Sequence, residues 1–179
     1  MLNAAPLTLD DNDPRVTSAE AAEKQLYDFY GISYVVRYIL LPRHGIKVRI
    51  TETGEGDPVV IVPGNTGDSF PFVSLLPHLH GRRIVIINRP GGGLSEGMDH
   101  TTVDFHDFAV ETLTNVFDAL GLDRAPIIAH SMGGHGHRGR EQPLWLQDRV
   151  SQLQGVPIAL VSFRYVGPFH RVHGRYGAL

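Results

Sequence analysis

Three short apolar runs, each long enough for one strand, constrain this chain more than any other feature of its sequence. They span 59–62, 83–87 and 125–129, and polar residues do not alternate within them. Such runs are typical of strands buried on both faces, as in a parallel sheet. Helical patterns separate the runs, a short one at 69–79 and a long amphipathic one at 102–120. This alternation predicts an α/β fold with a mainly parallel sheet and helices on both faces.

The residues before the first apolar run predict a hairpin and a helix. Two β-rich runs, 34–41 and 46–53, are separated by the turn sequence Pro42-Arg43-His44-Gly45, which is typical of an antiparallel hairpin. Upstream, Thr17-Ser18-Ala19-Glu20 has the spacing of a capping box, and Gly31 is a suitable C-terminal stop. A helix is therefore expected from the Thr17 region to about Tyr30.

The composition excludes several classes of protein. The chain has 179 residues, of which 42% are hydrophobic and 20% are charged, as in one globular domain. It contains no Cys, which excludes disulfides, thiolate zinc sites and a cysteine nucleophile. A net charge of −3 gives no reason to expect a nucleic-acid partner. The apolar runs are far shorter than the roughly 20 residues that span a bilayer, and the N-terminus has no secretory pattern, so we expect a cytoplasmic protein.

Ser131 carries the strongest functional signal. It follows the run 125–129 at an abrupt turn toward a predicted helix, and Ala129-x-Ser131-x-Gly133 has the frame of a nucleophile elbow with Ala in place of the first Gly. Small neighbours are needed because this turn is tight and strained. A serine held in this way stands above the C-terminal edge of the sheet, where its hydroxyl can attack a substrate.

Taken in order, these features resemble the α/β-hydrolase superfamily over about residues 35–134. Pro63-Gly64-Asn65-Thr66-Gly67 stands where that family often has His-Gly and the oxyanion residue. The segment 88–95 looks like the family's Asp-x-Arg-Gly-x-Gly-x-Ser pattern. Pro63 in place of His and Asn88 in place of Asp are departures, but neither removes a reacting group. The resemblance implies an incomplete α/β-hydrolase fold with an N-terminal antiparallel hairpin.

The resemblance also implies a function. Ser131 would be the nucleophile of a serine hydrolase that acts on a small ester-like substrate through an acyl-enzyme, with no cofactor and no metal. The backbone N–H groups of Asn65 and Met132 would form the oxyanion hole. An Asp in place of Ser131 would have indicated epoxide or haloalkane chemistry instead.

The catalytic acid and base are not identified in this way. In the family they follow the nucleophile, each after a later strand, whereas residues 132–179 have room for one strand, at 156–166. The remaining candidates are Asp148 as the acid and His170 or His173 as the base. The alternative is a catalytically incomplete fragment or a ligand-binding relic.

Charge changes at the same point of the chain. Residues 131–179 contain six Arg and two acidic residues, whereas the residues before them carry a net negative charge. A basic C-terminal surface, or a truncation or reading-frame change after Gly134, would each account for the change. We divide the chain into an N-terminal lead-in and helix (1–33), a partial hydrolase domain (34–166) and a tail expected to be disordered (167–179).

Three further patterns have ordinary explanations. The loop 64–69 could hold a phosphate, but the chain has no phosphate-binding G-x-x-x-x-G-K-[ST] motif. The pairs His78/His80 and His135/His137 lack a clear third metal ligand, so surface histidines are favoured. His130 is expected to pack rather than act as a base, because adjacent residues of a strand point to opposite sides.

Overall fold

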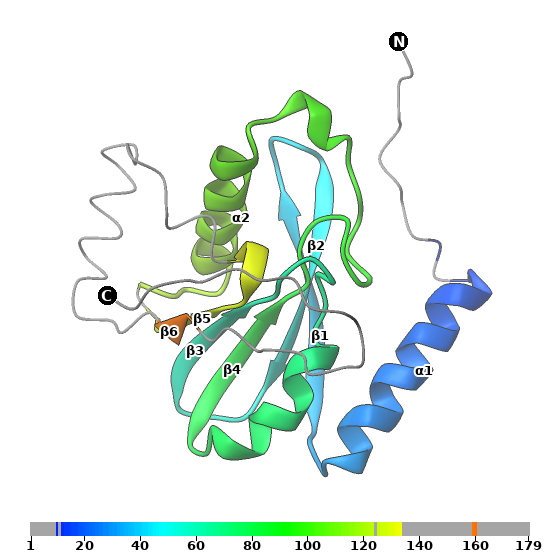
Figure 1. Cartoon of the computed structure of the whole chain (residues 1–179), viewed down its shortest axis with the longest axis vertical. Coiled ribbons are helices and arrows are strands. Elements are labelled where there is room, and N and C mark those ends of the chain that lie inside the picture. The colour runs from blue at the N-terminus through cyan, green and yellow to red at the C-terminus, as the bar shows by residue number, and fades with distance from the viewer. Residues whose placement is uncertain (1–9, 11, 124, 134–158, 161–179) are drawn as a thin grey trace, which may run out of the picture.

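The computed structural model describes residues 10, 12–123, 125–133 and 159–160 (Figure 1). Its labelled helical elements are α1 (Pro14–Phe29), η1 (Phe70–His78), η2 (His100–Thr102) and α2 (Phe105–Ala119), of which η1 and η2 are 3₁₀ segments. Its strands are β1 (Tyr34–Leu41), β2 (Ile46–Thr53), β3 (Asp57–Val62), β4 (Arg82–Ile87), β5 (Ile127–Ala129) and β6 (Ala159–Leu160). No helix of the described residues is long and apolar enough to cross a membrane.

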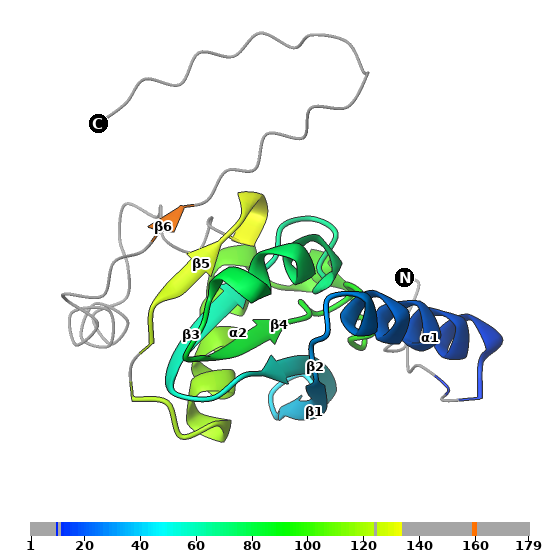
Figure 2. The same cartoon turned by 90° about the horizontal axis from the view of Figure 1, so that it is seen from below.

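The strands form one sheet in the order β1-β2-β4-β3-β5-β6. β2 pairs antiparallel with both β1 and β4, whereas β4, β3, β5 and β6 run parallel to one another. Figure 2 shows β5 and β6 at the side of the sheet away from β1. The predicted parallel sheet with an antiparallel N-terminal hairpin is confirmed, and β6 lies inside the predicted strand 156–166.

Both faces of the parallel strands are covered, which explains why the apolar runs do not alternate. In β3, Val60 and Val62 belong to a core that α2 closes through Phe108 and Val116. Val59 and Ile61 point to the other face and pack in a second core. That second core is closed by residues of α1 and η1: Tyr27, Phe72, Val73 and Leu76. The expected helices on both faces are therefore present.

The helix bounds differ from the sequence prediction at two N-termini. α1 begins at Pro14, because the Asp13 side chain accepts a hydrogen bond from the Arg15 amide at 2.8 Å and Pro14 favours the first helical position. The predicted capping box therefore lies within the helix. α2 begins at Phe105 after an Asp104 cap. Its C-terminus, like that of α1, agrees with the prediction.

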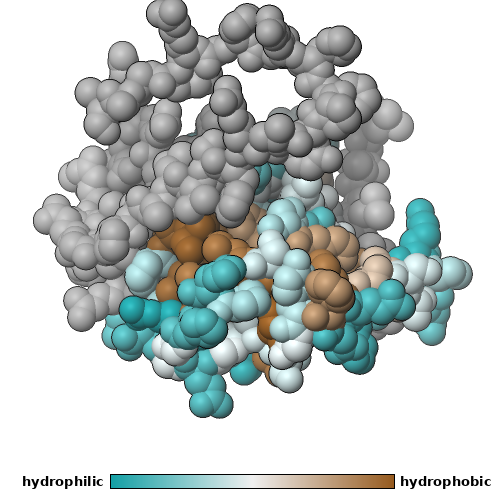
Figure 3. Space-filling view, turned by 60° about the horizontal axis from the view of Figure 1, so that its bottom comes forward, coloured by the Kyte–Doolittle hydropathy of each residue, from teal (hydrophilic) through white to brown (hydrophobic). Residues whose placement is uncertain are grey.

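The described surface is uneven in polarity. Figure 3 shows that one side is mainly hydrophilic, with apolar residues gathered in separate patches. The outer strand β1 exposes several large apolar side chains: Val35, Val36, Tyr38 and Leu40. The tail predicted at 167–179 lies outside the described residues.

Candidate active site

The candidate site lies at the C-terminal ends of β3, β4 and β5. Because these three strands are parallel, the loops that follow them meet at the same edge of the sheet. The loops span residues 63–68, 88–99 and 130–133. The first two connect to η1 and η2, and the third carries Ser131.

Ser131 has a backbone conformation that few residues adopt. Its φ is +50°, and among the described residues it is the one non-glycine residue with a positive φ. An L-residue in this region is strained, and such strain is concentrated at functional sites. The turn is held on both sides, because the His130 amide donates to the Val62 carbonyl at 3.0 Å and the Gly133 amide to the His130 carbonyl at 2.9 Å. The exposed Ser131 thus projects from a short, braced turn.

Two glycines allow this turn to touch the loop after β3. A Cβ on Gly133 would lie 2.4 Å from the Val62 carbonyl oxygen. A Cβ on Gly64 would lie 2.7 Å from the His130 Nδ1 atom. Both distances are shorter than real Cβ contacts, so a side chain at Gly133 would need the backbone to shift, and one at Gly64 would need the His130 ring to move. Gly133 is therefore needed for the approach to β3 as well as for the tight turn.

The loop after β4 packs against the same loop from its other side. The Arg89 amide donates to the Gly67 carbonyl at 2.9 Å, and a Cβ on Gly67 would lie 2.6 Å from the Gly92 Cα. Next to this contact, burial raises the pKa of the Asp68 carboxyl, although the Phe70 amide hydrogen-bonds to it. Residues 63–68 are thus enclosed between the elbow and the loop after β4.

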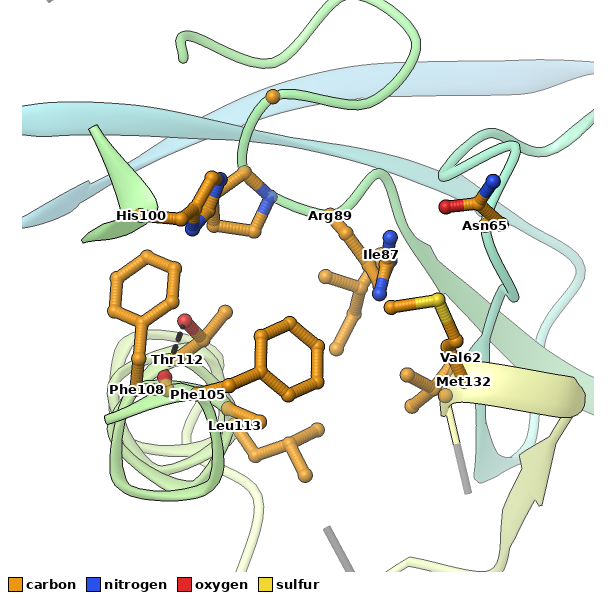
Figure 4. Close-up of a pocket in the computed structure, with 14 residues that line it drawn as sticks. Val62, Asn65, Ile87, Arg89, His100, Phe105, Phe108, Thr112, Leu113 and Met132 are labelled. Atoms are coloured by element: carbon orange, nitrogen blue, oxygen red, sulfur yellow. Dashed lines mark hydrogen bonds between the residues drawn. The ribbon is translucent and has the colours of Figure 1, made fainter. Parts of the chain in front are cut away.

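A cavity of about 430 Å³ opens between these loops and α2 (Figure 4). Asn65 and Met132, the two predicted oxyanion residues, both line it, as does Gly133. Most of the remaining lining is apolar and comes from the ends of β3 and β4 and from α2: Val62, Ile87, Phe105, Phe108 and Leu113. The structure therefore brings the predicted oxyanion residues together, beside the exposed Ser131.

Arg89 and His100 are the titratable side chains that line this cavity. Burial lowers the pKa of the Arg89 guanidinium, whose carbon lies 6.0 Å from the centroid of the Phe105 ring. Sequence reasoning had included Arg89 in a family-like segment without giving it a role. Its position directly after an apolar strand was a usable signal, since the C-terminal ends of parallel strands converge on ligand sites.

A buried ion pair supports the same edge from the opposite face. Arg49 of β2 and Glu23 of α1 form a bidentate pair, and both side chains are at least 98% buried. The Ser69 hydroxyl donates to a Glu23 carboxylate oxygen at 2.9 Å. Because Ser69 directly follows the loop 63–68 and precedes η1, the pair anchors the C-terminal end of that loop. Sequence analysis did not find this pair, as its residues lie far apart in the chain.

The other candidate residues have different positions. The His130 ring packs edge-on against Phe72, with ring centroids 6.1 Å apart, so its predicted packing role is confirmed. Asp148, His170 and His173 lie outside the described residues.

Comparison with known proteins identifies the fold. Residues 57–135 match the family model of the alpha/beta hydrolase fold. The described sheet has the strand arrangement expected from that match. This chain carries a partial α/β-hydrolase fold.

Two curated relatives named for hydrolytic reactions are much longer than the matched region. A 2-hydroxy-6-oxononadienedioate/2-hydroxy-6-oxononatrienedioate hydrolase of Burkholderia vietnamiensis is 28% identical over 114 residues, which are 55% of this chain and 37% of that protein. A proline iminopeptidase of Heyndrickxia coagulans is 31% identical over 129 residues, which are 62% of this chain and 45% of that protein. The chain therefore spans less than half the length of these relatives.

Solved structures agree on the fold. A Bacillus subtilis carboxylesterase has a TM-score of 0.56 at 17% identity, over 76% of this chain and 44% of its own. A proline iminopeptidase-related protein of Thermus thermophilus has a TM-score of 0.55 at 22% identity, over 67% of this chain and 42% of its own. At these identities the likeness concerns the fold alone.

Proposed function

We propose that this chain is a serine hydrolase that acts on a small ester-like substrate through an acyl-enzyme on Ser131. The observation that carries the proposal is the positive φ of Ser131 at the end of β5. A strained serine between Ala129 and Gly133, at the C-terminal edge of a parallel sheet, fits a nucleophile elbow. The hydrolase names of the relatives support the reaction class.

In this mechanism the Ser131 hydroxyl oxygen attacks the acyl carbonyl, and a base accepts the hydroxyl proton. The backbone N–H groups of Asn65 and Met132 donate to the oxygen on which negative charge develops. The alcohol then leaves with a proton, and water hydrolyses the acyl-enzyme. Asp148 as acid and His170 or His173 as base remain the candidates for the proton-transfer roles.

A second candidate function is binding without turnover. It would rest on the cavity and on Ser131, which lie among the described residues, without the candidate acid and base, which lie outside them. In the family the acid and base follow the nucleophile, so a partial chain can retain the cavity and Ser131 while lacking them.

A fluorophosphonate probe tests the proposal on the full chain. We expect one label per molecule in the wild type and no label in Ser131→Ala. Ser33→Ala is a matched control, because Ser33 is an exposed serine before β1, and it should label like the wild type. Labelling that persists in Ser131→Ala contradicts the assignment. Folded wild-type protein that takes no label favours the binding function.

A further inference from the structure

We propose that Arg89 binds a carboxylate on the acyl part of the substrate, so that the cavity selects esters that carry a negative charge. This inference rests on the proposed function of the cavity and names its substrate class. It is based on three observations: Arg89 has no carboxylate partner among the described residues, its side chain faces the cavity, and the described lining is mainly apolar.

Arg89 is the one arginine among the described residues that forms no salt bridge with another described residue. Its Nε atom is buried and has no hydrogen-bond partner among the described residues, which is also true of the Arg49 Nε atom, but Arg49 has Glu23 as its counter-charge. No carboxylate of the described part of the chain lies within 4.0 Å of its guanidinium, whereas the other described arginines each form a salt bridge: Arg15, Arg37, Arg43, Arg49, Arg82 and Arg83. Arg89 is thus a partly buried cation whose counter-charge the described residues do not supply.

The backbone of Arg89 is held in place while its side chain faces the cavity. Its amide is bound to the Gly67 carbonyl, in the loop that also carries Asn65. Figure 4 shows the guanidinium pointing into the cavity that Asn65 and Met132 line. A group bound to Arg89 would therefore share this cavity with the acyl group that the two backbone amides are proposed to hold.

The lining favours a carboxylate over other ligands. Among the described residues no Asp or Glu lines the cavity, and Phe105, Leu113 and Val62 make much of its wall apolar. In such surroundings a charge-assisted hydrogen bond is stronger than in water, and guanidinium matches a carboxylate with two parallel N–H donors. One cation balances one negative charge, and the apolar wall suits the methylene chain between this charge and the ester. Half-esters of short dicarboxylic acids have this chemistry.

Binding to the full-length Ser131→Ala protein tests the inference without turnover. Isothermal titration calorimetry should show that monomethyl glutarate or monomethyl adipate binds at least tenfold more tightly than its dimethyl ester. Adding Arg89→Met should remove this preference, and Arg89→Lys should retain part of it. Arg82→Met is the matched control, because Arg82 is an exposed arginine at the opposite end of β4 and pairs with Asp57.

Several results would overturn the inference. One is equal affinity for half-ester and diester, and another is a preference that survives Arg89→Met. A third is a preference for the half-ester that appears only when Glu141→Gln and Asp148→Asn are also present. That result would mean that one of these acidic residues neutralises Arg89 in the wild-type chain. The unfolding midpoint of Arg89→Met, measured alongside, shows whether the variant is folded.

Acylation by p-nitrophenyl esters separates this inference from the proposed function. If a neutral ester acylates Ser131 but a free carboxylate gives no advantage, the hydrolase function holds and the role of Arg89 is wrong. If half-esters bind through Arg89 but no ester acylates Ser131, the binding site is real and the hydrolase function is wrong.

Discussion

Arg49 in β2 and Arg89 just after β4 lie close to each other, but among the described residues only Arg49 has a carboxylate partner. The Asn88 amide donates to the Arg49 carbonyl, so the two arginines are one residue out of register across the β2–β4 edge. Arg49 lies on the face covered by α1 and η1, and its two terminal guanidinium nitrogens pair with the Glu23 carboxylate. Arg89 faces the cavity beside α2 and has no carboxylate partner among the described residues.

The difference separates a structural charge from one that is available to a ligand. The buried ion pair holds three elements together: α1 through Glu23, β2 through Arg49, and the start of η1 through Ser69. Arg89 has an aromatic contact with Phe105 but no carboxylate partner among the described residues, and partial desolvation makes its charge costly. Binding of an anion to Arg89 would offset this cost of desolvation.

The largest effect is expected when Arg49 loses its carboxylate partner, Glu23. Glu23→Gln should lower the free energy of unfolding by about 3–5 kcal/mol, because it leaves the Arg49 cation buried without its counter-charge. Urea unfolding followed by circular dichroism measures the change.

Arg89→Met is the matched control for that measurement. It should change the free energy of unfolding by less than about 1 kcal/mol, because no described carboxylate loses a partner. Equal destabilisation by the two variants would show that Arg89 also has a structural partner, and the contrast between the arginines would disappear.

The next largest effect concerns the contact between the Ser131 turn and β3, which forms part of the cavity that Arg89 faces. Gly133→Ala should destabilise the fold toward the upper end of the about 1–3 kcal/mol typical of overpacking, because its Cβ meets the Val62 carbonyl oxygen at 2.4 Å. Probe labelling of Ser131 should slow as well, since the elbow is displaced.

Gly45→Ala controls for the cost of replacing a glycine in a turn. Gly45 has a φ of +64° and nothing within 4 Å of its Cβ position, so about 1 kcal/mol is expected from backbone strain alone. Labelling of Ser131 should not change in this variant. A Gly133→Ala protein that labels at the wild-type rate would contradict the close contact between the elbow and β3.

The smallest effect concerns Asp68, which lies between two residues that bond to the two arginine sites. Gly67 accepts a hydrogen bond from the Arg89 amide, and Ser69 donates one to Glu23, the partner of Arg49. Burial raises the pKa of Asp68 in the folded state. Its stabilising contribution is therefore present below the unfolded-state pKa of about 4 and is lost as the pH rises through the raised folded-state value.

Asp68→Asn should remove this dependence. Relative to the wild type, the variant should gain stability as the pH rises from about 4 to 7, by less than about 1 kcal/mol because the carboxyl is only half buried. Unfolding measured at both pH values gives the difference. A variant that instead loses stability over this range would show that the ionised Asp68 carboxylate is favoured in the folded protein.

Much of the fold could be predicted because it depends on local patterns. The hairpin at 34–53 was found with the correct bounds, and the strands at 59–62 and 83–87 within two residues at either end. The start of α1 was missed although its signals are local, because two caps compete there. Asp13 followed by Pro14 outweighs the capping box at Thr17, since Pro favours the first position of a helix.

For the candidate site too, the residues that depend on local patterns could be predicted and those that depend on packing could not. Ser131 could be located from nearby residues alone. An apolar strand, the small residues Ala129 and Gly133 two positions to either side, and an abrupt turn all lie within a few positions of it. Asn65 followed from family resemblance. The chemistry around them could not be found in this way, because a pair such as Glu23 and Arg49 forms only when segments 26 residues apart are brought together by packing.

Sequence patterns were therefore enough for the strands, the hairpin and the position of the strained serine, since each depends on neighbouring residues. Folding in three dimensions assigned the two arginines to opposite faces and different roles. It also set Gly133 against the Val62 carbonyl of β3, and Gly64 against the His130 ring in the turn after β5. The physical reason is that burial and charge pairing are properties of a place in the packed molecule, and residues distant in the chain create that place.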